Sequence, residues 1–234
     1  MLKRIFPLTV LLWITLLATH ATAAPITDPM VDDATTYSFD GSGSIGLNAS
    51  AFDDPFNTRS GGFWFKAVDT GPRQMLYEEG GRINGLNIWL DQGQVNVGAW
   101  ANRAGHWLSQ PTTPDQWHHV AYVFDEGQLT LFYNRAPVQS VETGFSTIPR
   151  HTGANALGGV NGWTLIGNTA ADQLGTSSFY TGLLTGVSYD SAALLLSDID
   201  DMATRTIPNP VPPAALLLGS GLAGLVLLQR RRHL

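Results

Sequence analysis

The stretch TTPDQWHHVAYVFDEGQLTLFYNRAPV, residues 112–138, carries the clearest local pattern in the chain. It holds two runs rich in β-branched and aromatic residues, Trp117–Phe124 and Leu129–Tyr133. The four residues between them, Asp125-Glu126-Gly127-Gln128, include a glycine and acidic residues that favour a turn. The stretch therefore predicts an antiparallel β-hairpin.

Further short runs of the same kind lie on both sides of the hairpin, separated by Gly, Asn, Asp and Pro. One segment, Leu194–Ala203, has a helical pattern and begins with Ser197 or Asp198 as a cap. Many short strands with almost no helix are typical of a sandwich or jelly roll. We therefore predict an all-β antiparallel sandwich without internal repeats. Its other strands are expected at GGFWFKAV (61–68), Arg73–Tyr77, Leu86–Leu90, Gln94–Trp100, Trp163–Ile166 and Phe179–Tyr189.

Four segments, in order along the chain, resemble the laminin G-like (concanavalin A-like) jelly rolls. The hairpin segment resembles them in the Trp-His pair that opens its first strand. YSFDGSGSIGL (37–47) is similar to their first strand, and residues 61–100 to their S-x-W-x-K strand and the meander after it. FYTGLLTGVSYDSAALLLSDI (179–199) is similar to their closing strand and short helix. The resemblance covers residues 35–203 and implies the same jelly-roll fold.

The charge of the chain is unevenly distributed. Its 13 Lys and Arg stand against 19 Asp and Glu, a net charge of −6, and charged residues make up 14%. Five of the basic residues lie at the two ends, so the body has eight against 19 acidic residues, a balance of −11. A nucleic-acid binder needs a basic face, so we expect no nucleic-acid partner. The absence of cysteine excludes disulfides, thiol catalysis and cysteine-ligated metals.

The N-terminus has the three parts of a secretory signal peptide. Lys3 and Arg4 precede the apolar run Ile5–Leu17, which is followed by Ala21-Thr22-Ala23. A transmembrane anchor is the alternative, but a span needs ~20 apolar residues and this run is shorter. We therefore predict a signal peptide over residues 1–23.

Residues 208–234 combine a proline-rich start, the uncharged run Ala214–Leu228 and a terminal arginine cluster. The arginines favour a cytoplasmic end for a short membrane helix, and a plain tail anchor is the alternative. The string PVPPAALLLGSGLAGLVLLQRRRHL (210–234) resembles the PEP-CTERM sorting signal of Gram-negative bacteria. The residues that carry the resemblance are Val211, Pro212, Pro213, Arg230, Arg231 and Arg232.

The resemblance of the tail implies a partner and a destination. Exosortase, an integral-membrane enzyme, acts on such tails, and their carriers reach the cell surface or the exopolysaccharide matrix. We therefore expect an exported protein, anchored in the inner membrane before processing and then placed at the surface. The chain divides into a signal peptide (1–23), a laminin G-like domain (24–207) and a sorting tail (208–234).

Tryptophans offer the candidate ligand site. Sugar-binding proteins stack tryptophan rings on pyranose rings, and Trp100 and Trp107 flank ANRAGH (101–106), a predicted polar loop with the planar guanidinium of Arg103. Together with Trp89 these residues are the predicted ligand-binding set. Ordinary packing of the tryptophans is the alternative.

Three residues at the start of the hairpin have structural interpretations. Trp117 is expected to fill the core beneath the hairpin, because an aromatic residue buries a large area. His118 and His119 alternate across the strand, so one is expected to point inward and the other to the surface.

Calcium is the cofactor that the laminin G resemblance raises. Asp40 matches the aspartate of the family's F-D-G segment and is the candidate metal ligand. The closing strand of relatives often carries acidic residues where this chain has Leu184-Thr185-Gly186-Val187. Because Ca²⁺ requires six to eight oxygen ligands, a family-type site lacks part of its donor set here.

The sequence contains no pattern that supports catalysis, so we expect a protein that is not an enzyme. Retaining glycoside hydrolysis needs two carboxyl groups about 5 Å apart, on one face of a strand. Adjacent glutamates point to opposite faces, and no E-x-D-x-x-E, G-x-S-x-G or H-E-x-x-H motif occurs. The four glutamates are Glu78, Glu79, Glu126 and Glu142.

Two functions from different classes follow. The first is an exported recognition domain that binds carbohydrate, such as exopolysaccharide, or a surface protein. Its acidic, weakly charged surface suits neutral glycans or contacts bridged by calcium. The second is a structural matrix or surface protein that packs against its own copies without a specific ligand. A glycoside hydrolase is a third, less favoured alternative.

Overall fold

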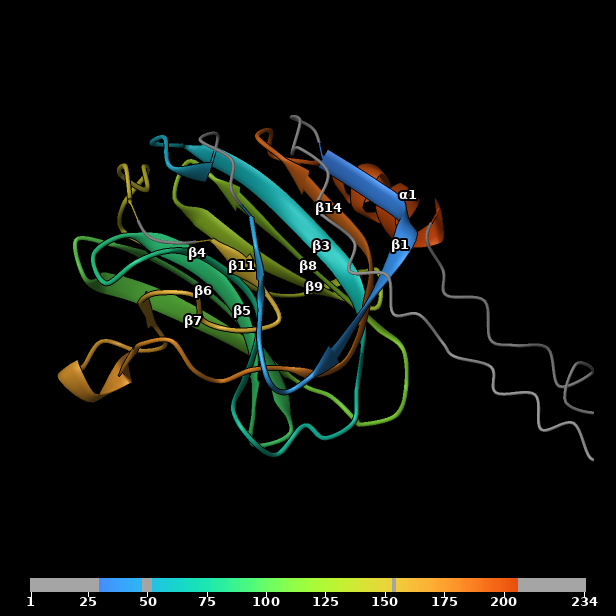
Figure 1. Ribbon diagram of the computed structural model, residues 1–234. Coiled ribbons are helices and arrows are strands. Elements are labelled where there is room, and N and C mark those ends of the chain that lie inside the picture. The colour runs from blue at the N-terminus through green and yellow to red at the C-terminus, as the bar shows by residue number, and fades with distance from the viewer. Residues whose placement is uncertain (1–29, 48–51, 153–154, 206–234) are drawn as a thin grey trace, which may run out of the picture.

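The computed structural model describes residues 30–47, 52–152 and 155–205, and these form two antiparallel sheets packed face to face (Figure 1). The first sheet has the strand order β1-β14-β3-β8-β9-β10. Its strands are β1 (Met30–Asp40), β14 (Thr181–Asp190), β3 (Thr58–Ala67), β8 (His118–Asp125), β9 (Gln128–Tyr133) and β10 (Ala136–Glu142).

The second sheet has the order β2-β11-β4-β5-β6-β7, and a two-stranded sheet, β12-β13, lies outside it. The predicted all-β sandwich is therefore confirmed. The strands of the second and third sheets are β2 (Ile45–Gly46), β11 (Ala156–Leu157), β4 (Gln74–Gly80), β5 (Gly85–Asp91), β6 (Gln94–Ala101), β7 (Ala104–Pro111), β12 (Thr164–Leu165) and β13 (Gln173–Leu174).

The hairpin predicted from residues 112–138 is present as β8 and β9. Asp125 pairs with Gln128, and the two residues between them have positive φ angles, 46° at Glu126 and 109° at Gly127. Positive φ at both central positions defines the tight turn that matches the twist of paired strands. The turn chemistry of the sequence thus sets the register of this hairpin.

Several elements of the structure depart from the sequence prediction. The stretch ANRAGH, expected to be a polar loop, is a tight turn between β6 and β7, with φ angles of 52° at Asn102 and 69° at Arg103. Strand β10 was not predicted because most of its residues are polar and exposed, which leaves no hydrophobic alternation to recognise.

The single α-helix of the described residues, α1 (Leu196–Arg205), packs on the outer face of the first sheet. It begins at Leu196, two residues after the start of the predicted segment and before both predicted cap residues, Ser197 and Asp198. Asp198 lies in the first turn, where its carboxylate accepts a hydrogen bond from the Leu195 backbone N–H (3.0 Å). Ile199 and Met202 pack against Ala121, Val123 and Phe132 of β8 and β9. An apolar stripe at helical spacing thus covers this face.

The helix corrects one expectation about the two histidines. His119 is fully buried, although one of the pair was expected at the surface. Its ring lies 5.4 Å from that of Trp64, whose indole nitrogen donates to the Ala203 carbonyl of α1 (3.0 Å). His118 faces the interior, near Phe65. Trp117 precedes β8 and is only partly buried, so it does not fill the core.

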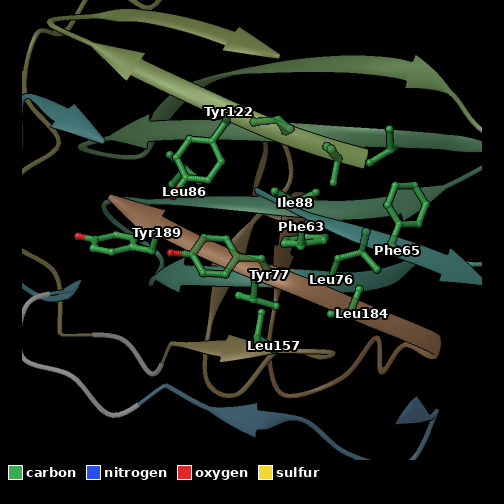
Figure 2. Close-up of a cluster of buried hydrophobic side chains, with 14 of the residues drawn as sticks. Phe63, Phe65, Leu76, Tyr77, Leu86, Ile88, Tyr122, Leu157, Leu184 and Tyr189 are labelled. Atoms are coloured by element: carbon green, nitrogen blue, oxygen red, sulfur yellow. The ribbon is translucent and has the colours of Figure 1, made fainter. Parts of the chain in front are cut away.

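Apolar side chains from both sheets fill the space between them. Figure 2 shows Phe63 and Phe65 of the first sheet together with Leu86 and Ile88 of the second. All four are buried. Burial of this apolar surface is the main favourable contribution to folding.

One ion pair crosses this apolar interior. Arg59 of β3 pairs with Glu79 of β4, and the two side chains are 3% and 0% exposed. The Tyr77 hydroxyl donates to the same carboxylate (2.5 Å), and the Arg59 guanidinium lies 3.6 Å from the centre of the Phe56 ring. Burial raises the pKa of Tyr77, which keeps its proton available for this hydrogen bond. A charge pair therefore joins the two sheets.

The edge strands β10 and β7 are joined by one side chain. The Gln139 amide donates to the Ser109 carbonyl (2.8 Å) and accepts from the Ser109 backbone N–H (3.2 Å). An amide side chain thus takes the place of a paired strand and closes one edge of the sandwich.

The predicted signal peptide (1–23) and sorting tail (208–234) lie outside the described residues. Among the residues that are described, no helix combines the length and apolarity needed to cross a membrane.

Breaking the Arg59–Glu79 pair should destabilise the domain. We expect Glu79→Gln to lower the free energy of unfolding by about 3–5 kcal/mol, because it leaves the Arg59 charge buried without its counter-ion. The double variant Arg59→Met with Glu79→Leu should lose less than Glu79→Gln alone. Denaturant unfolding measures both.

The matched control for this prediction is the exposed pair of Arg73 and Asp91 (2.8 Å). We expect Asp91→Asn to cost less than about 1 kcal/mol, because solvent screens exposed pairs. If Glu79→Gln and Asp91→Asn lowered the free energy of unfolding equally, the buried pair would contribute no more to stability than the exposed pair.

Candidate functional site

The predicted tryptophans lie on one face of the second sheet, its outer face. Trp100 pairs across strands with Gly85 and Gly105, and Trp107 pairs with Gly98. A Cβ at Gly98 would come within 2.3 Å of the Trp107 indole nitrogen, and one at Gly105 within 2.6 Å of Trp100 Cβ. The glycines therefore give these large rings room to lie flat on the sheet.

Residues 158–178, here called the covering segment, cross this face. The Asn87 amide donates to the Leu165 carbonyl (2.7 Å), and the Gly105 N–H donates to the Asn168 side chain (2.9 Å). Val160 of the segment packs with Trp89. The segment also contains β12, the short helix η2 (Ala170–Asp172) and β13. The chain itself thus occupies the aromatic face.

This covering changes the interpretation of the predicted ligand set. Trp89 is 4% exposed and Trp100 fully buried, so neither ring has a face open to a sugar. Trp107 is partly buried against the same cluster. Ordinary packing, the alternative that the sequence left open, describes Trp89 and Trp100, while Arg103 is exposed.

An open cleft lies at the end of the sandwich, beside the loop between β4 and β5. Asn84 of this loop joins three segments: its side chain accepts from the Asn102 N–H (2.8 Å) and donates to the Arg150 carbonyl (3.1 Å). The Trp100 indole nitrogen donates to the Gly81 carbonyl (2.9 Å), and the Arg103 N–H donates to the Ile83 carbonyl (2.8 Å). Trp100 and Arg103, both members of the predicted ligand-binding set, therefore hold the β4–β5 loop beside the cleft in place.

The cleft, here called the rim cleft, measures about 480 Å³. Its most exposed aromatic residue is Trp163, with 45% of its surface exposed. The Arg82 guanidinium lies 3.3 Å from the centre of the Trp163 ring, which fixes both side chains by a cation–π contact. The lining residues are Gly81, Arg82, Ile83, Asn84, Arg150, His151, Thr152, Gly162 and Trp163.

A second open hollow adjoins the turn between β6 and β7. It measures about 510 Å³, and Arg103, His106, Trp107 and Asn168 are among its lining residues. The hydrogen bond from Arg103 to Ile83 links this turn to the loop of the rim cleft. The two hollows therefore share one end of the sandwich.

His151 connects the rim cleft to the ion pair in the core. Its Nε2 lies 3.4 Å from the Glu79 carboxylate. Burial, and secondarily the Arg59 charge, lower the pKa of His151 to about 4. The ring is therefore neutral at pH 7 and adds no charge to the cleft.

Asp40, the candidate calcium ligand, lies at the end of β1. One oxygen of its carboxylate accepts from the Ser42 N–H (2.9 Å) and from the Ser42 hydroxyl (2.5 Å), and these bonds lower the pKa of Asp40. No group of three His, Asp or Glu that could hold a metal occurs among the described residues. Asp40 alone does not supply the oxygen ligands that calcium requires. Calcium binding stays a prediction.

The four glutamates do not meet at the cleft. Glu78 and Glu79 are adjacent on β4, and both are fully buried. Burial, partly offset by a hydrogen bond from the Asn161 backbone, raises the pKa of Glu78 to about 9. Glu126 lies in the β8–β9 turn, and Glu142 accepts a hydrogen bond from the Gln128 side chain (3.0 Å).

A family model described as the concanavalin A-like lectin/glucanases superfamily matches residues 39–200. The chain belongs to this superfamily. The predicted laminin G-like jelly roll is thereby confirmed, since the matching model is of the laminin G type. No curated protein matches the sequence.

Solved structures similar to this superfamily member include carbohydrate-binding domains. The binding domain of botulinum neurotoxin serotype G has a TM-score of 0.55 at 8% identity over 75% of this chain and 44% of its own. A leech intramolecular trans-sialidase has a TM-score of 0.58 at 14% sequence identity, and the match covers 79% of this chain and 29% of the trans-sialidase. The CBM40 of a Ruminococcus gnavus sialidase, bound to α2,3-sialyllactose, has a TM-score of 0.54 at 12% sequence identity. This match covers 74% of this chain and 99% of the CBM40. The chain spans less than half of the first two. At such low sequence identities, the structural similarity shows a shared fold and nothing about function.

Sequence reasoning did not select Trp163 or Arg82 for the site of this superfamily member. The sequence places Trp163 at the start of a short strand and gives no sign that this strand lies outside the sandwich. The one local signal is the string GGRING (80–85), whose glycines frame an arginine and an apolar residue in a turn.

Glu78 should make the stability of this superfamily domain fall with rising pH. Between its ordinary pKa of 4.5 and about 9, the unfolded chain releases this proton while the folded chain keeps it. We expect Glu78→Gln to remove this loss, so its advantage over wild type grows by up to about 1.4 kcal/mol per pH unit. Denaturant unfolding at pH 5 and pH 8 measures it.

Glu142→Gln is the matched control, because Glu142 is exposed. Its stability difference from wild type should be the same at the two pH values. If Glu78→Gln behaved in the same way, the buried carboxyl would not carry a raised pKa.

Proposed function

We propose that the protein is an exported recognition domain that binds carbohydrate in the rim cleft. The observation that carries the proposal is the exposed pair of Trp163 and Arg82 beside polar side chains of the cleft. A flat aromatic and guanidinium surface packs against a sugar ring, while the exposed Thr152 hydroxyl lies where it can hydrogen-bond a sugar hydroxyl. The sialyllactose bound to the CBM40 of similar fold supports this by analogy.

The proposal is for recognition without catalysis. Hydrolysis of a glycosidic bond requires two carboxyl groups that flank it. None of the described residues that line the rim cleft is acidic, and the buried carboxyls of Glu78 and Glu79 belong to opposite faces of β4. These placements favour a binding domain over a hydrolase.

The tail completes the proposal. The resemblance of residues 210–234 to a PEP-CTERM signal supports delivery to the surface of a Gram-negative cell by an exosortase. The ligand would then be exopolysaccharide or a surface glycan in the same compartment. Calcium would add to binding only if residues beyond Asp40 complete its ligand set.

Trp163→Ala should weaken carbohydrate binding by about tenfold, because a central aromatic contact is lost. Purified full-length protein in mild detergent is titrated on an array of immobilised polysaccharides, with and without EDTA. Leu195→Ala is the matched control, since Leu195 is also exposed but precedes α1.

The outcomes separate the alternatives. Saturable binding that depends on Trp163 supports recognition in the cleft. Self-association without binding to any polysaccharide would favour the structural matrix protein instead. Release of reducing sugar from any polymer would overturn the proposal that the domain is not an enzyme.

The arginines of the tail should be needed for sorting. Replacement of Arg230, Arg231 and Arg232 by glutamine should retain the protein in the inner membrane, because the positive end of the tail is lost. Cell fractionation and surface labelling measure its location. Unchanged display at the surface would contradict the sorting proposal.

A further inference from the structure

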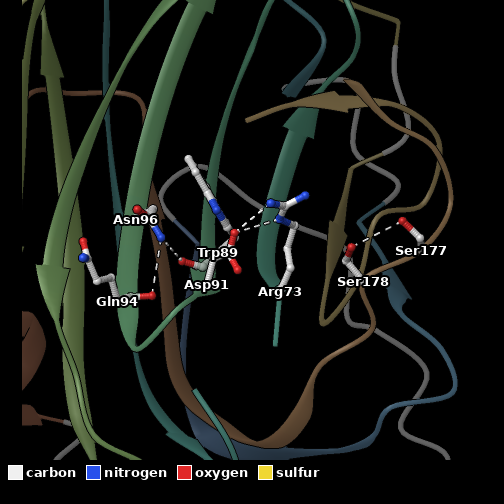
Figure 3. A network of polar contacts seen from close by, with 7 residues as sticks. All are labelled: Arg73, Trp89, Asp91, Gln94, Asn96, Ser177 and Ser178. Atoms are coloured by element: carbon white, nitrogen blue, oxygen red, sulfur yellow. Dashed lines mark hydrogen bonds and ion pairs between the residues drawn. The ribbon is translucent and has the colours of Figure 1, made fainter. Parts of the chain in front are cut away.

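Some basic residues of the domain form ion pairs with nearby acidic groups, but those at one end of the sandwich differ. The sequence between residues 30 and 205 contains eight basic residues. Arg59, Arg73 and Arg135 pair with Glu79, Asp91 and Asp200. Figure 3 shows how the Arg73 guanidinium meets the Asp91 carboxylate, with donor distances of 3.0 and 2.8 Å.

Three other arginines, Arg82, Arg103 and Arg150, gather at the rim. Arg82 and Arg150 line the rim cleft, and Arg103 lines the adjoining hollow. All three are exposed, and none forms an ion pair with another described residue. None of the described residues lining either hollow is acidic. The rim therefore has three exposed arginines and no acidic side chain in its described lining, while Asp53 acts on His151 from outside that lining.

The contact with Trp163 orients Arg82 for an anion. The five N–H donors of a guanidinium lie in its plane, and its face rests on the Trp163 ring at 3.3 Å. The ring cannot accept hydrogen bonds from the donors at the edge of the guanidinium. These donors are left for a group with two oxygens in one plane, such as a carboxylate.

The backbone beneath the arginines is held in place. Asn84 binds the Arg150 carbonyl and the Asn102 N–H, and the Arg103 N–H binds the Ile83 carbonyl. These bonds join three loops that carry one arginine each. The separation of the three positive charges is thus set by the fold before any ligand arrives, which lowers the entropy cost of binding.

We propose that the ligand of the rim cleft is an acidic polysaccharide, bound through its anionic groups by Arg82 and Arg150, with Arg103 extending the surface. This inference rests on the proposed function and specifies its ligand class. It replaces the expectation of a neutral glycan, which followed from the net charge of the whole domain. Salt screens charges that lie farther away than about one Debye length, so a bound glycan is affected mainly by the charges at the site and less by the net charge of the domain.

Three polymers test the proposal. Polygalacturonate carries carboxylates, dextran sulfate carries sulfates, and dextran is neutral. We expect purified full-length protein in mild detergent to bind at least one acidic polymer about tenfold more tightly than dextran at low salt. The polymer that binds identifies the anionic group, and binding should weaken as salt is raised.

Arg82→Gln with Arg150→Gln should weaken binding to the acidic polymer by about tenfold or more. Arg205→Gln is the matched control, because it removes one exposed charge at the end of α1, on the other sheet. Its affinity should stay within about twofold of wild type. Thermal unfolding of each variant confirms that the surface changes leave the fold intact.

Three results would overturn the proposal, each in a different part. Equal binding to dextran, lost in Trp163→Ala but unchanged in the arginine variant, would reject the acidic ligand and keep carbohydrate recognition. Binding to none of the polymers in this test, together with none on the polysaccharide array, would reject both. An acidic polymer bound equally well by the arginine variant would reject the rim as its site.

Discussion

The ion pair between Arg59 and Glu79 constrains the whole sandwich, because it places opposite charges from two sheets inside an apolar core. A buried charge without its partner is costly, so the sheets must keep the packing that brings β3 against β4. The same carboxylate is contacted by Tyr77 and lies 3.4 Å from His151, which lines the rim cleft. The buried ion pair is therefore in contact with His151, one of the residues that line the candidate site.

The outer face of the second sheet explains why recognition is assigned to the rim. Its tryptophans lie flat beside glycines and would form a wide aromatic surface if the sheet were bare. The covering segment occupies that surface and is tied to it through Asn87 and Asn168. Burial of Trp89 and Trp100 stabilises the fold. The exposed Trp163 belongs to the covering segment itself, at the edge where the loops meet.

Much of the fold could be predicted because its signals are local. The turn at Glu126-Gly127 and the alternation in β5 and β6 depend on residues that are adjacent in the sequence. What covers each face of a sheet depends on segments that are distant in the sequence, and local patterns do not predict it. Nothing near His119 indicates that α1, some 80 positions later in the sequence, buries it. Trp100 likewise has the pattern of a ligand platform, but it is fully buried beside Gly85 and Gly105 of the neighbouring strands, and its indole nitrogen donates to the Gly81 carbonyl. The arginines of the rim come together from three loops, which no spacing in the sequence reveals.

The side chain of Gln139 has a consequence for assembly. By bonding both backbone groups of Ser109, it ties the outermost strands of the two sheets to each other. A free strand edge recruits strands from other molecules and so leads to fibrils. At this border the Ser109 groups that would start such recruitment are already used. A strand from a second molecule therefore finds no free Ser109 backbone group to pair with at this border.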